Sequence, residues 1–554
     1  MSFLVPLPVI VPLLGAGITL VLARHPRAQR TTSVAALTVT FGVALALLIT
    51  AHIEGPQVVR VGGWPVPLGI VLVADQLATL MLVVSTAVTL CVLLYSIGEG
   101  RADGRESTPV AIYHPTYLIL TAGVTNAFLS GDLFNLYVGF EILLGASYVL
   151  LTLGGTEVRI RAGTTYVVVS ILSSVIFLTA IGLVYAATGT VNLAQLADRL
   201  DGLPDDLRLV LQLMLLLAFG IKAAVFPLSA WLPDSYPTAP APVTAVFAGL
   251  LTKVGVYAII RTETLLFPGG RTRDLLLVVA LLTMVVGILG AVAQSDIKRL
   301  LSFTLVSHIG YMLFGIALGT AAGLAAAIFY VVHHITVQTT LFLATGLVER
   351  RGGSTNLERL GGLARAAPLL AALFFLPALN LAGIPPFSGF LGKLGLLQAG
   401  VADGGPLVWA VVAGAVLTSL LTLYTVTRVW NLAFWRKTAP QATAGGPATV
   451  PATAAAPAPA AATQPATTPS ATRAVSGVRV PSTDSASTPL AADGPGSVEP
   501  MPPLLVGATT ALVLLGLALT VLAGPLFQIG TEAAANLVSR TPYVDAVFPP
   551  GGAR

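Results

Sequence analysis

The chain has 554 residues, of which 55% are hydrophobic and only 10% are charged, with a formal net charge of +5. Soluble globular proteins carry about 25% charged residues, and this much apolar surface in water would cause aggregation. The composition therefore excludes a soluble enzyme, a coiled coil and a disulfide scaffold, and it predicts an integral membrane protein.

Fourteen stretches are apolar enough, at about 20 residues each, to cross a bilayer. We therefore expect an all-α polytopic membrane protein with about 14 transmembrane helices. The expected spans lie near residues 3–23, 33–52, 70–96, 110–129, 132–153, 164–188, 208–230, 241–261, 274–293, 300–319, 323–348, 366–399, 407–434 and 503–527.

Positive charge in the loops predicts how the chain crosses the membrane. Arg24, Arg27 and Arg30 follow the first span and no positive residue precedes it, which is the reverse of a signal peptide. Loops after odd-numbered spans hold 17 Arg and Lys, whereas the other loops and the C-terminal tail hold 8 when Arg208 and Arg261 at the adjoining span ends are included. Since cytoplasmic loops carry the excess of positive charge, we expect both termini outside a bacterial cell membrane. The basic net charge has the same origin, so no nucleic-acid partner is expected.

Residues 438–500 interrupt this pattern with a stretch of Ala, Pro, Thr, Ser and Gly. Such a composition buries too little apolar area to offset the entropy of ordering the chain. We therefore expect three parts: a thirteen-helix membrane domain over 1–437, a disordered cytoplasmic linker over 438–500, and a fourteenth helix with an external tail over 501–554.

Two of the predicted spans contain helix breakers beside a lysine. In the seventh span five prolines follow Lys222 within GIKAAVFPLSAWLPDSYPTAPAP, and in the twelfth Pro385-Pro386 precedes Lys393. Proline removes a backbone donor and clashes with the preceding turn, so helices 7 and 12 are expected to break. Broken backbone at membrane depth is tolerated only inside protein or beside a wet cavity. Paired breaks of this kind indicate a transporter site between inverted repeats.

The spacing of matched residues predicts the same internal repeat. Lys393 lies 171 residues after Lys222, and Asp296 lies 164 residues after Asp132. These offsets map the fifth span onto the tenth and the seventh onto the twelfth. Because five helices separate the partners, the second copy is inverted, and we expect five-helix repeats over about 110–261 and 274–435.

Ionisable residues inside the spans are the candidates for function. Glu141 lies mid-span, and Lys222, Lys253 and Lys393 are three of only five lysines in the chain. An intramembrane charge is costly and usually marks an ion or proton pathway. Lysine also loses its proton readily when desolvated, whereas arginine does not. We interpret these residues as a proton relay. A protonated Glu141 in a packing contact, or lysines that reach out to the surface, are the simpler alternatives.

Histidines and aspartates complete the candidate set. His333-His334 lie within the eleventh span, and a histidine can pass protons between lysines. His308 is a weaker candidate, because a buried histidine often only bonds a neighbouring helix. Asp132 and Asp75 lie at span ends, where they are either ion-access groups or ordinary helix caps.

No sequence pattern indicates a cofactor or a metal. Cys91 is the single cysteine, so the chain cannot build a disulfide, an iron–sulfur cluster or a thiolate zinc site by itself. An HExxH motif, a P-loop, a dinucleotide fingerprint and a GxSxG elbow are also absent from the sequence. We expect neither a metal nor a cofactor, and a transporter component rather than an enzyme.

Four blocks carry a resemblance to a known family: GDLFNLYVGFEILLGASYVLL, GIKAAVFPLSAWLPDSYPTAPAPVTAVFAGLLTKVGVYAIIR, SDIKRLLSFTLVSHIGYMLFGIAL and LNLAGIPPFSGFLGKLGLLQAG. They are similar to the proton-translocating, antiporter-like membrane subunits of NADH–quinone oxidoreductase (complex I), membrane-bound hydrogenases and Mrp-type cation/proton antiporters. The resemblance covers about residues 1–435 and is strongest to the D-type subunits of the Mrp-type antiporters.

The resemblance carries roles onto individual positions. It implies that Glu141 is the family's essential glutamate, Lys222 the lysine of the first broken helix, Lys253 the lysine of the next span and Lys393 the charge of the second broken helix. It also implies fourteen helices, sister subunits as partners, and exchange of Na+, Li+ or K+ for H+. Ser229 and Tyr236 stand where relatives often carry His, and Gln338 where many carry Lys.

Two other functions fit the same residues. An antiporter-like subunit of a redox complex would use the same relay while partner chains handle electrons, and its genetic neighbours would encode cluster-binding subunits. A scaffold subunit with a vestigial relay is the third interpretation, against which Glu141, Lys222 and Lys253 together argue.

Overall fold

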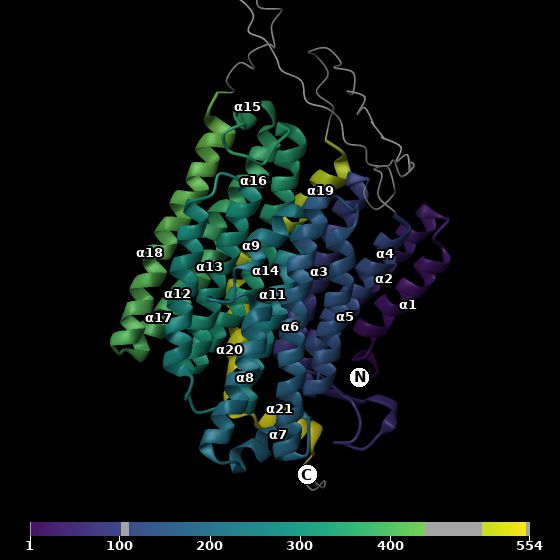
Figure 1. Ribbon diagram of the computed structural model, residues 1–554, viewed down its shortest axis with the longest axis vertical. Coiled ribbons are helices and arrows are strands. Elements are labelled where there is room, and N and C mark those ends of the chain that lie inside the picture. The colour runs from purple at the N-terminus through teal and green to yellow at the C-terminus, as the bar shows by residue number, and fades with distance from the viewer. Residues whose placement is uncertain (1, 101–109, 438–500, 550–554) are drawn as a thin grey trace, which may run out of the picture. The chain divides into compact units, whose positions relative to one another are not determined.

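The computed structural model describes residues 2–100, 110–437 and 501–549, and these form one helical bundle (Figure 1). The segment 438–500, predicted as a disordered linker, lies outside the described residues. The α-helices are α1 Leu7–Val21, α2 Pro26–Glu54, α3 Gln76–Glu99, α4 Tyr113–Leu129, α5 Leu133–Thr152, α6 Glu157–Thr188, α7 Leu193–Arg199, α8 Asp205–Ala223, α9 Trp231–Ser235, α10 Ala241–Val246, α11 Thr252–Arg261, α12 Arg273–Val292, α13 Ile297–Leu318, α14 Ala321–Gly352, α15 Leu363–Ala366, α16 Pro368–Ala382, α17 Ser388–Asp403, α18 Pro406–Val429, α19 Pro503–Val521, α20 Ala523–Ser539 and α21 Thr541–Val547.

Short elements complete the described chain. One antiparallel hairpin pairs β1 Gln57–Arg60 with β2 Val71–Ala74. Three π-helical segments extend or precede α-helices: η7 Phe247–Leu251, η8 Thr262–Leu266 and η9 Trp430–Trp435. The fold is thus all-α apart from this hairpin, as the composition predicts.

Eleven helices in the described ranges are long and apolar enough to span a membrane. The count of fourteen stays a prediction, because the helices at the other three predicted spans, α4, α8 and the α16–α17 pair, are not among these eleven. The first break follows α8, which ends at Ala223 with Ala224 in the left-handed region at φ 57°. The second separates α16 from α17, with Gly383 at φ 84° closing α16. Both breaks fall where the prolines predict them.

Matched local structure supports the predicted repeats. An isolated bridge pairs Asp132 with Asn192, and another pairs Asp296 with Asn356, both partners lying 164 residues further on. The bounds of α14 follow those of α6 by the same offset, and each of these helices ends at a left-handed glycine. Asn192 begins α7 at the lower end of Figure 1, whereas Asn356 precedes α15 at the upper end. This opposite placement is what inverted repeats require.

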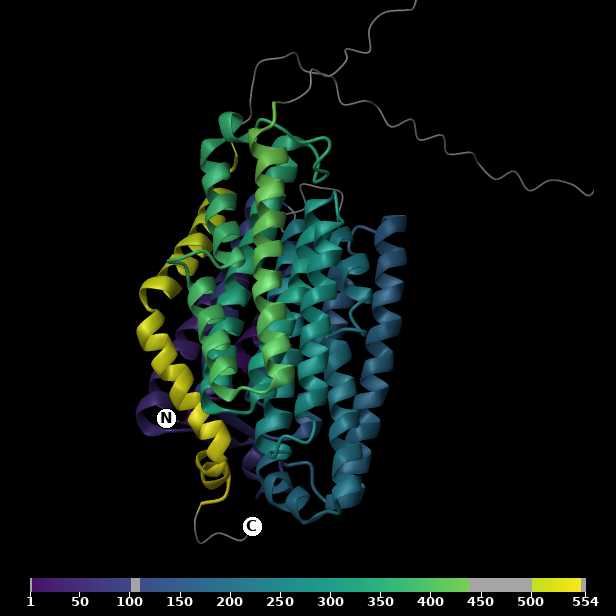
Figure 2. The ribbon, with the colours of Figure 1, turned by 90° about the vertical axis from the view of Figure 1, so that its left-hand side faces the viewer.

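The C-terminal region differs from the predicted single span with a tail. In the structure α19 ends at Val521, and α20 and α21 continue the helical path to Val547. Figure 2 shows α19 and α20 (yellow) running along one side of the bundle. Phe527 stacks on Phe329 of α14, with ring centroids 4.1 Å apart. This contact holds α20 against one of the most buried helices of the fold.

Burial separates an inner from an outer set of helices. The apolar window of α14 is entirely buried, as is that of the α10–α11 run, whereas α6, α12 and α18 expose rows of aliphatic side chains. Exposed aliphatic rows suit contact with lipid or with other membrane subunits. Every intramembrane lysine and histidine of the candidate relay is therefore on, or packed against, the inner helices.

Candidate functional site

Glu141 and Lys222 are joined through a serine from a third helix. The Ser174 hydroxyl on α6 donates a hydrogen bond to Oε1 of Glu141 on α5. Lys222 Nζ, in the last turn of α8, donates to the same Ser174 oxygen at 2.9 Å. A hydroxyl can donate and accept at once, so Ser174 bridges the carboxylate and the ammonium. The arrangement is a hydrogen-bonded chain of three side chains from three helices.

The break after α8 places Lys222 for this contact. Because α8 ends one residue later, the Lys222 side chain lies beside the unwound segment, and the residue is only 7% exposed. Its ammonium also lies 5.5 Å from the ring centroid of Phe140, a cation–π distance. A small cavity with a volume of about 20 Å³ adjoins Lys222, Tyr166 and Trp231. This cavity has room for about one water molecule next to the lysine.

Lys253 sits on the next helix without a counter-ion. Its side chain is fully buried, and Nζ donates to the carbonyl of Ala248 at 2.6 Å. Ala248 belongs to the π-helical segment η7, which directly precedes α11. π-Segments are frequent at functional sites. Within the described residues no carboxylate forms an ion pair with Lys253, so its charged form is held by a carbonyl alone.

Three histidines and a tyrosine form a buried group between α13 and α14. His308 and His334 have ring centroids 5.2 Å apart, and Nδ1 of His308 lies 2.9 Å from the hydroxyl of Tyr330. The ring of His333 lies 5.3 Å from that of Tyr330. His334 lies within electrostatic range of both Lys253 and Lys393. The predicted pair His333-His334 thus lies in this buried group. His308 belongs to the same group, although the sequence makes His308 the weaker candidate.

The second break holds Lys393 by backbone carbonyls. Lys393 Nζ donates to the carbonyls of Leu381 and Ala382, at 3.1 and 3.0 Å. These carbonyls belong to the last turn of α16, where an α-helix leaves its acceptors unpaired. The helix break therefore creates the acceptors that bind the lysine, and the same residue lies 5.1 Å from the ring of Tyr311.

Asn380 ties the break to the histidines. Its Oδ1 accepts hydrogen bonds from the Gly389 amide at 2.8 Å and from the Ser388 hydroxyl at 3.3 Å. Nδ1 of His333 lies 3.0 Å from the same hydroxyl. A Cβ on Gly389 would stand 1.9 Å from the Asn380 carbonyl, so only glycine fits there. The sequence gives no sign of the roles of Asn380 and Ser388, because nothing distinguishes them from other polar residues in spans.

The predicted relay is therefore two clusters with gaps between them. Glu141, Ser174 and Lys222 form a hydrogen-bonded cluster. The histidines form a cluster of ring contacts with Tyr330 and Tyr311, and Lys393 reaches this cluster over the Tyr311 ring, while Lys253 lies between the two. Among the described residues, no hydrogen bond joins Lys222 to Lys253 or Lys253 to a histidine. Proton transfer across these gaps requires water or side-chain motion. At Gln338, the amide donates to the Leu301 carbonyl at 2.7 Å and does not fill the gap.

The two aspartates predicted for ion access are buried helix caps. Asp132 accepts from the Asn135 amide at 2.6 Å at the start of α5. Asp75 caps α3 through the Ala78 amide at 2.9 Å and pairs with Arg261 at 2.6 Å. The Asp75–Arg261 pair links α3 to the end of α11, and Tyr543 of α21 covers the guanidinium at 5.1 Å. Ion access at either aspartate stays a prediction, whereas the structure shows directly that both aspartates cap helices and that Asp75 forms an ion pair.

Breaking this buried pair is expected to destabilise the protein. Asparagine also caps helices, so Asp75→Asn removes the charge and leaves the cap. The unpaired Arg261, whose side chain is 3% exposed, should cost about 3–5 kcal/mol. The control is Asp234→Asn, since the Arg299–Asp234 pair is 47% and 62% exposed and such pairs contribute about 0–1 kcal/mol. Thermal unfolding of the purified complex should show a large drop for the first variant only; equal drops would contradict this.

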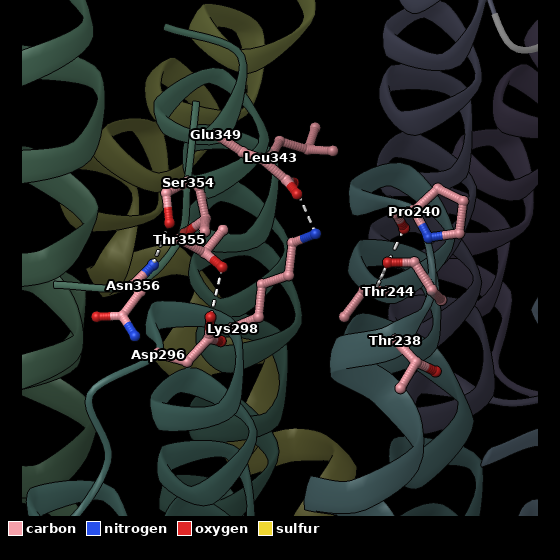
Figure 3. A network of polar contacts seen from close by, with 12 residues as sticks. Thr238, Pro240, Thr244, Asp296, Lys298, Leu343, Glu349, Ser354, Thr355 and Asn356 are labelled. Carbon is pink, nitrogen blue, oxygen red and sulfur yellow. Dashed lines mark hydrogen bonds and ion pairs between the residues drawn. The ribbon is translucent and has the colours of Figure 1, made fainter. Parts of the chain in front are cut away.

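Ion pairs at the opposite end, uppermost in Figure 1, connect the second repeat to the first break. Lys298 pairs with Glu349 at 2.6 Å, and the Thr355 hydroxyl donates to Asp296 (Figure 3). Arg299 reaches Asp234 on α9 at 2.9 Å. The start of α13 is therefore tied both to α14 and to the short helix after the first break.

Metal binding finds no support in the described part of the chain. No group of three or more His, Cys, Asp or Glu side chains is placed to hold a metal ion there. The buried ionisable groups are instead spread along the bundle, from Glu141 and Lys222 through Lys253 to the histidines and Lys393. Such an arrangement suits the stepwise movement of a proton.

Fold and site together define a class: a polytopic membrane subunit with two broken helices, each beside a lysine, and a carboxylate bonded through a serine to one of those lysines. Residues 130–422 match the family described as NADH:quinone oxidoreductase/Mrp antiporter, transmembrane. The chain belongs to this family.

Relatives and solved structures narrow the comparison. The D-type subunit of the Na+/H+ antiporter of Alkalihalophilus pseudofirmus is 41% identical over 438 residues, which are 78% of this chain and 87% of that protein. A chain of the Mrp complex from Dietzia sp. DQ12-45-1b superposes with a TM-score of 0.83 at 34% identity, covering 99% of this chain and 100% of that one. A chain of respiratory complex I from Thermus thermophilus has a TM-score of 0.74, with 96% and 99% coverage, and at 24% identity it shares the fold.

Proposed function

We propose that this chain is the D-type subunit of a Mrp-type multisubunit antiporter that exchanges a monovalent cation for H+. Its relative in Alkalihalophilus pseudofirmus is a Na+/H+ antiporter subunit, which makes Na+ the first candidate, with Li+ and K+ as alternatives. The observation that carries the proposal is the contact of Glu141 and Lys222 through Ser174 at the first break. Sister subunits are its expected partners.

Within this proposal the proton moves along Glu141, Lys222, Lys253, His334 or His333, and Lys393. Each step changes the charge next to the following group, and electrostatic coupling is strong where water is excluded. Ser174 shortens the step between Glu141 and Lys222, and the histidine cluster shortens the step toward Lys393. Water in the cavity beside Lys222 would carry the proton from Lys222 toward Lys253. The chain supplies no redox chemistry in this mechanism, so its contribution is transport.

We further propose that the α15 end of the bundle faces the cytoplasm, which leaves both termini outside. Lys298, Arg299 and Arg436 lie at that end, where positive charge is expected. Ion pairs occur at both ends, as in Lys298–Glu349 at 2.6 Å and Arg208–Asp201 at 2.7 Å, so the argument rests on the number of positive residues. The excess of Arg and Lys in the loops after odd-numbered spans supports this orientation, in a bacterial cell membrane.

Everted membrane vesicles test the function directly. The chain would be expressed with its sister subunits in a host without other Na+/H+ antiporters, and a respiratory pH gradient would be imposed. Addition of Na+ should collapse the gradient, and Li+ and K+ added separately define the selectivity. Vesicles lacking this chain are the control. A complete, assembled complex that leaves the gradient intact with all three cations would contradict antiport and favour the subunit of a redox complex.

A further inference from the structure

The lining residues of one recess lie near the end of the bundle that carries α7 and α21, which is the lower end in Figure 1. The volume of the recess is about 320 Å³. The lining comes from η8, α12, the end of α13, α14 and α20, and includes Glu263, Arg273, Leu318, Leu324 and Val538. We call it the outer vestibule. It lies where the two repeats and the C-terminal helices meet.

Glu263 lines this vestibule and contacts the two helices that bear the lysines of the first repeat. It lies on η8, which continues α11, ten residues after Lys253. Its Oε1 accepts a hydrogen bond from Gln212 at 2.9 Å, and Gln212 lies on α8 ten residues before Lys222. Ten helical residues correspond to about 15 Å. Glu263 is thus placed at a similar distance along the helices from both lysines.

The charges around Glu263 leave it without a cation. Its second oxygen, Oε2, accepts from the Thr272 hydroxyl at 2.6 Å, so both hydrogen-bond donors are neutral. The nearby arginines form ion pairs with aspartates instead: Arg208–Asp201, Arg271–Asp205 and Arg273–Asp403. No ion pair among the described residues involves Glu263. A carboxylate that both faces a water-accessible recess and lacks a counter-ion is suited to bind a proton.

Helix ends of both signs line the vestibule. Ala317 and Leu318 are the last residues of α13, and the C-terminus of a helix carries a partial negative charge. Arg273 and Leu324 lie in the first turns of α12 and α14, and the N-terminus of a helix carries a partial positive charge. These dipoles oppose one another, so the affinity of the vestibule for a proton rests on Glu263.

We propose that Glu263 is the proton-exchange group between the outer vestibule and the lysines of the first repeat. In the step, the Glu263 carboxylate takes a proton from water in the vestibule and later passes it inward, or the reverse, with no other bond changed. This inference rests on the proposed function, because it supplies the relay with its access at the α21 end. Gln212 and Thr272 are the positioning residues.

Glu263→Gln tests the role in the complete complex in vesicles. Glutamine keeps the size of the side chain but cannot exchange a proton at neutral pH. The initial rate of Na+-induced gradient collapse should fall at least about tenfold, because loss of a proton-transfer group acts on this scale or above it. Glu532→Gln is the matched control, because Glu532 lies at the same end, pairs with His52 at 3.0 Å and does not line the vestibule. Its rate should stay at the wild-type value.

A second variant separates exchange from folding. Glu263→Asp keeps the carboxylate, so the rate should recover to at least about half, with a displaced pH profile since proton transfer depends on the environment of the group. If Glu263→Gln fails to assemble, the pH profile of Glu263→Asp decides. Wild-type rate in assembled Glu263→Gln, or an unchanged profile in Glu263→Asp, overturns the inference. An inactive wild-type complex would instead overturn the proposed function.

Discussion

Replacement of Glu141 by glutamine in an assembled complex is expected to abolish Na+-dependent collapse of the pH gradient. The reason is geometric: Ser174 donates to the Glu141 carboxylate and accepts from Lys222, so Glu141 is one end of the bonded unit. A glutamine can keep a hydrogen bond to Ser174 but cannot take up a proton. The rate should therefore fall to that of vesicles lacking the chain.

Two variants separate this effect from damage to the fold. Glu157→Gln, at the exposed start of α6, removes a carboxylate from the same part of the bundle and should leave the rate unchanged. Ser174→Ala keeps both charges but removes the bridge, so an intermediate rate is expected. Assembly of each complex would be checked on a native gel. Full activity in an assembled Glu141→Gln complex would refute the role of Glu141.

Comparison of these residues shows which features the sequence makes predictable. The breaks beside Lys222 and Lys393 were predictable because proline has a local effect on a helix that depends little on context. The contact of Glu141 with another polar group was predictable because a mid-span carboxylate is costly wherever it packs, and its role in proton transfer stays a prediction. Ser174 was not, since a serine in a span carries no such cost and its importance arises only from which helices meet.

The same distinction, between local effects of a residue and contacts between distant helices, explains why the vestibule and the role of the Asp75 cap were not predicted. Glu263 lies close to a span end, where a carboxylate is unremarkable in sequence, and only the position of Gln212 beside it reveals the link to α8. Asp75 has the sequence context of an ordinary cap, and its pairing with Arg261 joins residues 186 positions apart. The C-terminal path through α20 depended on packing against α14 rather than on hydropathy. Contacts between residues far apart in the sequence are therefore the part of the structure that composition and spacing do not predict.

Lys253 is expected to lower the stability of the fold while being required for antiport. A buried lysine without a counter-ion costs about 2.5–3.5 kcal/mol at the centre of a spanning helix on insertion scales. The Ala248 carbonyl in η7 is the hydrogen-bond acceptor that offsets part of this cost. Lys253→Met, which preserves much of the side-chain volume, is therefore expected to leave thermal stability unchanged or higher while antiport is lost.

Lys298→Met is the matched control, because the opposite effects on stability and antiport are expected for it. Lys298 is also buried but pairs with Glu349 at 2.6 Å, outside the proposed proton path. Its replacement leaves Glu349 unpaired, so thermal stability should fall slightly while antiport by the assembled complex persists. Measuring both quantities on both variants distinguishes the two roles. If Lys253→Met retained antiport, or lost activity only through unfolding, Lys253 would be a structural residue and the path between the two clusters would have to run elsewhere.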